Sequence, residues 1–346
     1  MVQRVGVKDV ARVAGIAPAT VSHALNNTGT ISKETAARVR QVAADMGYRP
    51  NRVAANLRRQ RTSTLGVLIP TLSNPFFSKL LEALETAGSA RGYSLVFGDT
   101  NHDPALDAHY VDLFLDQRCD GIIVVAGTSD LAGVIRADVP IVLVNTHLPA
   151  AEVRAPAVEI DDMHGMYSAV AHLIRLGHRR IGLVTYHHDT PRLQGYRRAL
   201  ADAGIAFDAA LVVAATRMSR LLEDAGERAY ELLRAHPDLT ALAASADVAA
   251  IGAMRAAYRV GRRVPDDLAV VGFDDINLAA MMAPALTTVA QPIDAMATAA
   301  LDLMLEQINE GSVALDHRRV RLETHLIVRE SCGQRKGGEG QTAEHG

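Results

Sequence analysis

The sequence predicts a small all-α unit followed by a larger α/β unit with parallel sheets and helices on both faces. Two observations support this prediction. The first 47 residues hold three segments whose apolar side chains recur with the period of a helix. From Leu65 onward, short apolar runs typical of buried strands alternate with longer helical stretches, as in a parallel sheet covered by helices. About 270 residues follow this pattern, which is enough for two lobes.

The N-terminal segments predict a helix-turn-helix. Residues 7–14 place apolar side chains on one face, and Gly15 ends this helix because glycine readily adopts positive φ. Pro18 fits the first turn of a second helix that runs to residue 25. Ser32 is expected to cap a third helix, which extends to residue 46 and stops at Gly47. Two short helices joined by a tight turn containing glycine form the motif, and the third packs against them.

The larger unit is predicted from its alternating elements. The expected strands are residues 65–70, 94–97, 121–125, 141–144, 181–185 and 268–272. The expected helices are residues 76–91, 105–118, 167–176, 193–204, 222–236 and 248–260. A polar, basic stretch separates the two units. The predicted regions are a headpiece at 1–50, a linker with a short helix at 51–63, a two-lobed domain at 64–332 and a disordered tail at 333–346.

Charge is divided unequally along the chain. Residues 1–61 hold eleven lysine and arginine residues against three acidic ones, a net charge of +8, and the remainder carries −11. A basic head on an acidic body is expected when one end of a protein meets the phosphates of a nucleic acid. The alternative is a basic terminal arm with no specific role.

Composition and motif spacing exclude several classes of site and location. Cys119 and Cys332 have no motif spacing, which excludes a thiolate zinc site and argues against a secreted disulfide scaffold. No apolar run approaches the roughly 20 residues of a membrane span. The N-terminus lacks the apolar core of an export signal, so we expect a cytoplasmic protein. The run of residues 187–189, His-His-Asp, is not predicted to bind metal, because adjacent residues cannot easily share one tetrahedral ion.

Long segments of the chain match a known pattern. They include VKDVARVAGIAPATVSHALNNTGTISKETAARV, GYRPNRVAANLR and LGVLIPTLSNPFF, then CDGIIV, HLIRLGHRRIGLV, RLQGYRRAL, VPDDLAVVGFDD, PALTTVAQP and LIVRES. These segments closely resemble the LacI/GalR family of bacterial transcriptional repressors over about residues 5–332. The resemblance implies a repressor with a helix-turn-helix headpiece and a two-lobed sensor of the periplasmic-binding-protein type. It also implies an effector, a sugar or a related metabolite, in the cleft between the lobes.

The resemblance further implies a homodimer that binds a pseudo-palindromic operator in double-stranded DNA. One short recognition helix reads too few base pairs for useful specificity, which agrees with this implication. The C-terminus has no leucine heptads that would tie dimers into tetramers.

DNA contacts are implied on the second helix, whose N-terminal end enters the major groove in this motif. The positions that match base-reading residues are Pro18, Ala19 and His23. Ala19 suits a thymine methyl group, and a ring nitrogen of His23 suits a purine edge. The positions that match phosphate contacts are Thr20, Ser22 and Asn26. The alternative for Thr20 and Ser22 is local hydrogen bonding at the helix end.

Three headpiece positions depart from the family's pattern. Relatives commonly have serine or threonine at Gly6 and serine at Ala17, each as an N-cap. Ala17 offers no side-chain oxygen to the exposed amides, which costs about 1 kcal/mol relative to serine. We therefore expect modest headpiece affinity. Many relatives have arginine at His23, so a different preferred base is expected.

In the linker, the resemblance implies a hinge helix that pairs with its counterpart from a second subunit in a widened minor groove. Leu57 matches the wedge leucine that inserts between base steps and kinks the duplex. Asn51 would cap this helix, and Arg58 and Arg59 would approach phosphates. The alternative for Leu57 is ordinary helix packing. Because a helix this short is not stable alone in water, we expect its folding to be coupled to DNA binding.

Effector contacts are implied where strands end and helices begin. Arg192 matches the family's ligand-binding arginine, and Asp274 matches a carboxylate that accepts two sugar hydroxyls. Phe76 is placed to stack on an apolar ring face, with Phe77 buried instead. The alternatives are that Asp274 caps a helix and that Phe76 belongs to the core. Weaker candidates are Ser73, Asn145 and Gln291.

Because the sensor differs from its relatives in two features, the effector of any one relative cannot be assigned to this chain. Ala246 stands where relatives often have a ligand-binding asparagine, and residues 185–191 form a shorter segment than in many relatives.

Two other functions compete with gene regulation. An exported sugar-binding protein would use the two-lobed unit alone, but the basic head and the missing export signal argue against this function. The sequence also has no G-x-G-x-x-G after a strand, no P-loop and no nucleophile elbow, which argues against an enzyme. We therefore predict no enzymatic activity, no cofactor and no metal.

Overall fold

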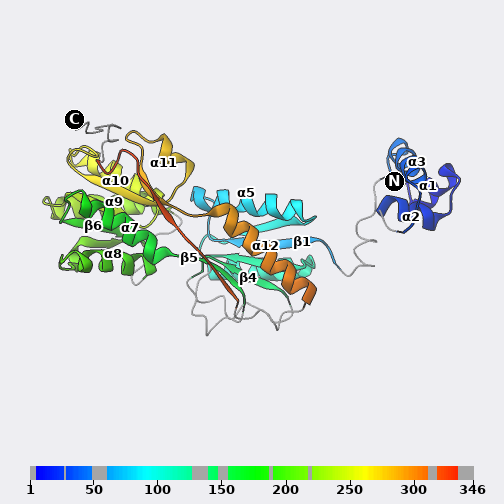
Figure 1. Cartoon of the computed structure of the whole chain (residues 1–346), viewed down its shortest axis with the longest axis horizontal. Coiled ribbons are helices and arrows are strands. Elements are labelled where there is room, and N and C mark those ends of the chain that lie inside the picture. Colours follow the sequence, from blue (N-terminus) through cyan, green and yellow to red (C-terminus); the bar gives the residue numbers. More distant parts are fainter. Residues whose placement is uncertain are drawn as a thin grey trace, which may run out of the picture. The chain divides into compact units, whose positions relative to one another are not determined.

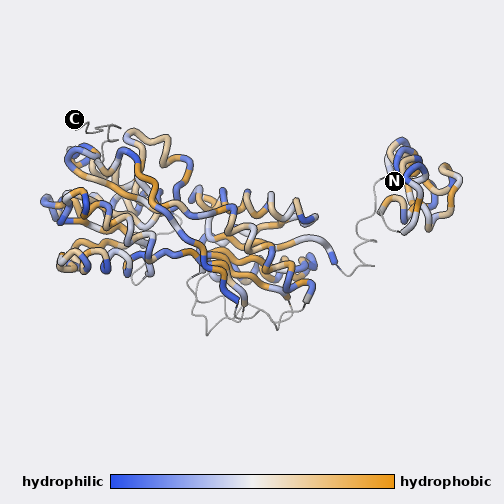
Figure 2. The backbone as a smooth tube through the Cα atoms, viewed as in Figure 1, coloured by the Kyte–Doolittle hydropathy of each residue, from blue (hydrophilic) through white to orange (hydrophobic). Residues whose placement is uncertain are grey.

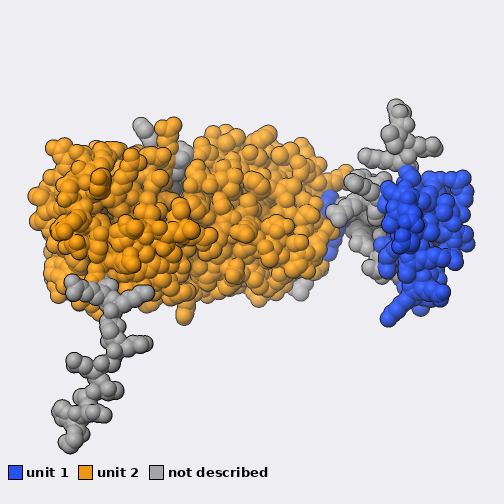
Figure 3. Space-filling view, turned by 90° about the horizontal axis from the view of Figure 1, so that it is seen from above, with its two compact units in different colours: residues 1–62 blue, residues 63–346 orange. Residues whose placement is uncertain are grey.

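The computed structural model describes residues 5–26, 29–48, 61–126, 139–146, 155–186, 190–216, 220–310 and 318–333. The chain divides into two compact units, residues 1–62 and 63–346 (Figures 1 and 3). Within the described ranges, no helix has the length and apolar character needed to cross a membrane.

The first unit is a three-helix headpiece. Its helices are α1 (Val7–Ala14), α2 (Pro18–Asn26) and α3 (Lys33–Asp45). They bury a small apolar core formed by Val10, Ala11, Val21, Ala24, Val39 and Ala43. The predicted helix ends are confirmed, since Gly15 adopts a φ of 66° after α1 and the Ser32 Oγ accepts the Thr35 N–H at 3.2 Å.

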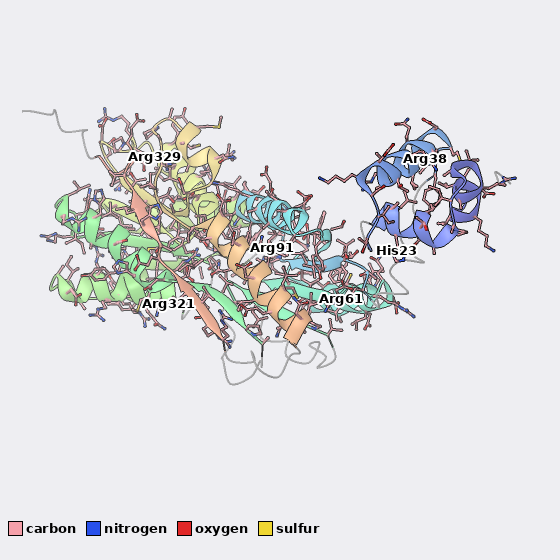
Figure 4. All side chains as sticks on the ribbon, turned by 45° about the vertical axis from the view of Figure 1, so that its right-hand side comes forward. His23, Arg38, Arg61, Arg91, Arg321 and Arg329 are labelled. Atoms are coloured by element: carbon pink, nitrogen blue, oxygen red, sulfur yellow. The ribbon has the colours of Figure 1, made fainter. Side chains whose placement is uncertain are left out.

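Two side chains secure the ends of α1. Gly6 provides no capping oxygen, but the Asp9 carboxylate accepts the Gly6 N–H at 2.9 Å. At the other end, the guanidinium of Arg38 on α3 donates to the carbonyl of Ala14 at 2.9 Å (Figure 4). A positive charge is favourable there because the carbonyls at a helix C-terminus carry partial negative charge.

The second unit holds two six-stranded sheets, each at the centre of one lobe. In lobe 1 the sheet order is β11-β5-β4-β3-β1-β2, and every neighbouring pair is parallel. The strands are β1 (Thr64–Ile69), β2 (Ser94–Asp99), β3 (Gly121–Val125), β4 (Ile141–Val144), β5 (Ala157–Ile160) and β11 (Arg319–Leu322). Helices α5 (Pro75–Ala90) and α12 (Ile293–Glu310) pack together on one face, and α6 (Pro104–Asp116) covers the other.

Lobe 2 has the order β12-β10-β9-β8-β6-β7, parallel except for the β10–β12 pair at one edge. The strands are β6 (Ile181–Thr185), β7 (Val212–Ala214), β8 (Ala241–Ala244), β9 (Ala269–Asp274), β10 (Thr287–Ala290) and β12 (His325–Ile327). The helices are α7 (Asp162–Arg175), α8 (Pro191–Asp202), η2 (Ala209–Leu211), α9 (Leu221–Ala235), α10 (Asp247–Arg259) and α11 (Asn277–Met281). Helix α7 packs on α8, and α9 packs on α10.

The chain passes between the lobes from β5 to α7, from β10 to α12 and from β11 to β12. Two of these connections are tied together at Asp161. The Thr324 hydroxyl donates to the Asp161 carbonyl at 3.2 Å, and Arg321 lies 2.9 Å from the Asp161 carboxylate (Figure 4). Both contacts therefore join neighbouring segments of the chain at the lobe boundary.

The predicted fold class is confirmed, and the apolar strands that predicted it form the core of both lobes (Figure 2). Predicted strands 121–125, 141–144 and 181–185 coincide with β3, β4 and β6. Strands β5, β7, β8, β10, β11 and β12 and helices α11 and α12 were not predicted. Alanine dominates β8, and alanine favours helix over strand, which explains why this central strand lacks a strand-like sequence.

The contact between α7 and α8 gives a test of packing. A Cβ at Gly195 would lie 2.2 Å from the Met163 carbonyl oxygen, so Gly195→Ala must separate the helices and should lower the free energy of unfolding by about 1–3 kcal/mol. Gly88→Ala on α5 is the matched control, because its Cβ would meet Leu95 at an ordinary 3.5 Å. That control should be neutral or stabilising. Urea denaturation measures both variants, and equal effects would contradict the packing argument.

Candidate effector cleft and DNA-reading helix

Polar side chains gather at one edge of the lobe 2 sheet. Ser245 follows β8, Asp274 ends β9 and Gln291 follows β10. These strands are neighbours and parallel, so their carboxyl ends lie at the same edge, where α/β proteins commonly bind ligands. Arg192, in the first turn of α8, reaches the same place.

Arg192 is the centre of a buried ion cluster. Its Nε donates to Asp162 Oδ1 at 2.6 Å, and its Nη1 donates to the Ser245 carbonyl and lies 3.6 Å from Asp274 Oδ1. The guanidinium carbon lies 3.7 Å from the centroid of the Phe273 ring. Burial alone would lower the pKa of Arg192, but Asp162 and Asp274 outweigh burial and raise it. The guanidinium is therefore charged and held in one orientation.

Asp274 lies at the lobe boundary. Its Oδ1 accepts from Gln291 Nε2 at 2.7 Å, and the side chain of Asn74, the N-cap of α5 in lobe 1, lies close enough to lower its pKa. Burial raises the pKa of Asp274 to about 7, although Arg192, Gln291 and Asn74 act in the opposite direction. Its φ of 118° is a costly backbone conformation for a residue other than glycine. Strain of this kind concentrates at functional sites.

Asp247 adds a second titratable carboxyl group beneath Asp274. It is fully buried at the start of α10, where it accepts the Ile276 N–H at 2.9 Å and the Thr288 hydroxyl. Both of these donors are uncharged. Burial, and then the negative charge of Asp274, raise the pKa of Asp247 well above its ordinary value.

The structure brings together three of the predicted effector residues, Arg192, Asp274 and Gln291. Asn145 lies at the end of β4 in lobe 1, buried and with a φ of 51°. Ser73 is exposed just before α5. Asp274 does not cap the helix that follows it, because the N-cap of α11 is Ile276.

The expectation for the two phenylalanines is corrected by the structure. Phe76 is 2% exposed and belongs to the lobe 1 core, whereas Phe77 is half-buried. Helix α5 begins at Pro75, so Phe76 starts a row with Leu80 and Leu84, at four-residue spacing, that faces the sheet. The two rings meet edge to face, with centroids 5.2 Å apart.

Sequence reasoning did not identify Asn74, Asp162, Ser245 or Asp247. A signal existed for Asn74, because asparagine followed by proline is a common helix start. Ser245 and Gln291 are also distinctive in another respect. The Ser245 Oγ and Gln291 Oε1 atoms are buried and have no hydrogen-bond partner among the described residues.

In the headpiece, α2 presents the predicted base-reading residues to the surface. Pro18, Ala19 and His23 are exposed, whereas Thr20 and Ser22 are half-buried. His23 lies beside Gly29, where a Cβ would come within 3.2 Å of the imidazole Nδ1 (Figure 4). Asn26 is the last residue of α2. The predicted hinge residues Asn51, Leu57, Arg58 and Arg59 lie outside the described residues.

Within the described ranges, no group of three or more histidine, cysteine, aspartate and glutamate side chains is placed to hold a metal ion. Residues 187–189 lie outside those ranges.

Two family models match the chain. Residues 6–51 match the model described as bacterial regulatory proteins, lacI family, and residues 170–332 match a periplasmic-binding-protein-like domain. The HTH-type transcriptional regulator DegA of Bacillus subtilis is 37% identical over 300 residues, which cover 84% of this chain and 87% of DegA. The chain belongs to the lacI family of bacterial regulators.

Solved structures agree with this assignment to the lacI family. The lac repressor dimer bound to operator and the anti-inducer ONPF has a TM-score of 0.80 at 25% identity, covering 95% of this chain and 99% of the repressor chain. The complex of the regulator CelR with cellobiose has a TM-score of 0.68 at 29% identity, covering 95% and 100%. As a member of this family, the protein is a DNA-binding transcriptional repressor that is controlled by an effector.

We predict that removing the cation of the buried cluster strongly lowers the free energy of unfolding. Arg192→Met leaves Asp162 and Asp274 without their buried partner, which should cost about 3–5 kcal/mol of unfolding free energy. Arg198→Met, on the same helix, is the control, since this side chain is 66% exposed and 3.7 Å from Asp202. The control should change little because exposed ion pairs contribute little. Similar losses in both variants, measured in urea at pH 7.5, would argue against the cluster's role.

Proposed function

We propose that the effector is a sugar or a closely related polyol, bound between the two lobes by Asp274, Arg192 and Gln291. The position of Asp274 supports this proposal, because this carboxylate accepts a hydrogen bond from Gln291 at the lobe boundary and lies near Asn74 of lobe 1. A carboxylate accepts two hydroxyl hydrogens, and a guanidinium donates to hydroxyl oxygens. The binding of cellobiose by CelR supports a sugar. Ser73 and Asn145 stay candidates on the lobe 1 side.

We also propose that the protein acts as a homodimer on a pseudo-palindromic operator. Tyr258 on α10 and Leu278 and Met281 on α11 are apolar yet 83%, 47% and 79% exposed, which suits a surface that a second copy covers. Two headpieces would then insert α2 into successive major grooves, with Pro18, Ala19 and His23 at the base edges. The contacts of Thr20, Ser22 and Asn26 would be to phosphates.

The hinge assignment stays a prediction from the family pattern. In it, residues 51–63 link headpiece and sensor, Asn51 caps a hinge helix, Leu57 wedges into the minor groove and Arg58 meets a phosphate. Such a helix forms only when two subunits hold its ends together on DNA. Movement of the lobes about their boundary would therefore strengthen or weaken operator binding.

In this proposal the cleft binds its ligand without converting it. Because the target is chromosomal DNA, we place the protein in the cytoplasm, at the nucleoid.

Asp274→Ala tests the cleft. The variant should lose the effector-dependent change in operator affinity, typically about 5- to 150-fold, while its affinity without effector stays that of the wild type. A thermal-shift screen of sugars identifies the ligand, because binding raises stability. Operator titrations with and without that ligand then compare wild type, Asp274→Ala and the exposed-surface control Asp266→Ala. A mutant that responds at the same ligand concentration would show that the cleft is misassigned, and a collapse of ligand-free affinity would assign Asp274 a structural role.

His23→Ala tests base reading. Loss of one base contact should weaken operator binding about tenfold and leave binding to random DNA nearly unchanged. Gln41→Ala, on the exposed side of α3, is the control that should change neither. The measurement is a titration of both DNAs at one fixed salt concentration. An equal loss on operator and random DNA would assign His23 to phosphate contact instead.

A further inference from the structure

Three carboxyl groups and one guanidinium lie buried together at the effector site. Asp162, Asp247, Asp274 and Arg192 are each no more than 3% exposed. Arg192 bonds Asp162 at 2.6 Å and lies 3.6 Å from Asp274, whereas Asp247 accepts from a hydroxyl and a backbone N–H. Among the described residues, one positive charge therefore lies beside three acidic groups.

The described charged groups around this cluster leave its net charge negative. On the same strand end as Asp274, Asp275 is paired with Arg329 at 2.6 Å (Figure 4). Tyr186, after β6, faces the guanidinium from 5.9 Å and has a pKa raised by burial, so it is neutral at physiological pH. Even with one carboxyl group protonated, the cluster of described residues remains negative.

The uncharged groups at the site point to the same kind of ligand. Gln291 donates from its Nε2 to Asp274, because a carboxylate only accepts, and this leaves Oε1 as an acceptor. That oxygen is buried in a residue 7% exposed and has no partner among the described residues. A buried acceptor without a donor is costly, so a ligand that donates hydrogen bonds is favoured. Both the carboxylate oxygens and the amide oxygen at this site therefore favour a ligand that has hydrogen-bond donors.

We propose that this cleft selects an uncharged or cationic sugar and rejects sugars that carry a phosphate or carboxylate group. The inference rests on the proposed function, that a sugar is the effector, and adds the charge that the sugar must have. An anionic group would enter beside Asp274 and Asp247, with Arg192 already bonded to Asp162 and the Ser245 carbonyl. Hydroxyl or ammonium groups would instead donate to Asp274 and Gln291.

Titration of Asp274 gives a second readout. Hydroxyl groups that donate to this carboxylate favour its ionised form, so a neutral sugar lowers the pKa of Asp274 from about 7 and releases a proton on binding. Its affinity should be constant above pH 7 and should fall, by up to about tenfold per pH unit, below it. A sugar acid behaves oppositely, because protonating the cluster removes repulsion while the ligand keeps its charge.

The experiment measures dissociation constants by calorimetry for matched sugars. The probes are ribose, galactose and cellobiose, with ribose 5-phosphate and galacturonate as anionic forms and galactosamine as the cationic one. In the wild type at pH 7.5, the neutral sugar that binds should have an affinity about a hundredfold higher than that of its anionic form. Asp247→Asn replaces an ionisable carboxyl group by an uncharged amide, which retains an oxygen for the Ile276 N–H and a polar group for Thr288. Because the pKa of Asp247 is raised, wild type and variant are compared at pH 7.5 and at pH 9, where more of the wild-type carboxyl group is ionised. At pH 9 the variant should narrow the difference in affinity between the neutral and the anionic sugar about tenfold.

The outcomes separate the two proposals. Asp202→Asn, an exposed carboxylate on α8, is the control and should leave the gap unchanged. An anionic sugar that binds as tightly as its parent, or a gap that Asp247→Asn leaves intact, overturns the charge selection while a sugar effector stands. Failure of every sugar in the set to bind overturns the proposed effector class, and the charge selection with it. If Asp247→Asn does not fold, the pH dependence of the wild type tests the charge selection instead. The affinities of galactose and galacturonate must then converge as the pH falls from 7.5 to 6.

Discussion

The buried ion cluster around Arg192 is the interaction on which the effector site depends. A buried guanidinium is tolerated only when it is paired and hydrogen-bonded, so Asp162 on α7, the Ser245 carbonyl after β8 and Asp274 on β9 must all be in place. This requirement fixes the position of α8 relative to two strands and α7. The same contacts give Asp274 one orientation, which a ligand-binding group needs.

In the proposed function, the cluster would couple ligand binding to the position of the lobes. Asp274 accepts from Gln291 where the chain leaves β10 for α12, and Asn74 of lobe 1 lies near it. A ligand that bonds these groups would change the free energy of one lobe arrangement relative to another. Only such a difference in affinity shifts a conformational equilibrium, and it acts reciprocally on DNA binding.

Fold class and most of the lobe 1 strands could be predicted, because apolar runs such as residues 121–125 have few structural alternatives. Strand β8 could not, since its four residues are mostly alanine and only burial between β6 and β9 makes them a strand. In the site, Arg192 and Asp274 came from a family pattern. Asp162 bonds Arg192 across 30 residues, and Asn74 reaches Asp274 from the other lobe. Contacts between residues this far apart in the sequence depend on tertiary packing, which a local sequence pattern does not predict.

The site is built at a cost to the stability of the protein without ligand. Two carboxyl groups with raised pKa lie near each other, Asp274 has a strained backbone, and the Gln291 oxygen has no donor among the described residues. A ligand that donates hydrogen bonds to the Gln291 oxygen and to the buried carboxylate would lower part of this cost. Strained and under-bonded groups persist only where the surrounding structure enforces them, which the Arg192 cluster does here. In the proposed function, such a ligand would shift the lobes to the extent that it lowers this cost more in one lobe arrangement than in the other.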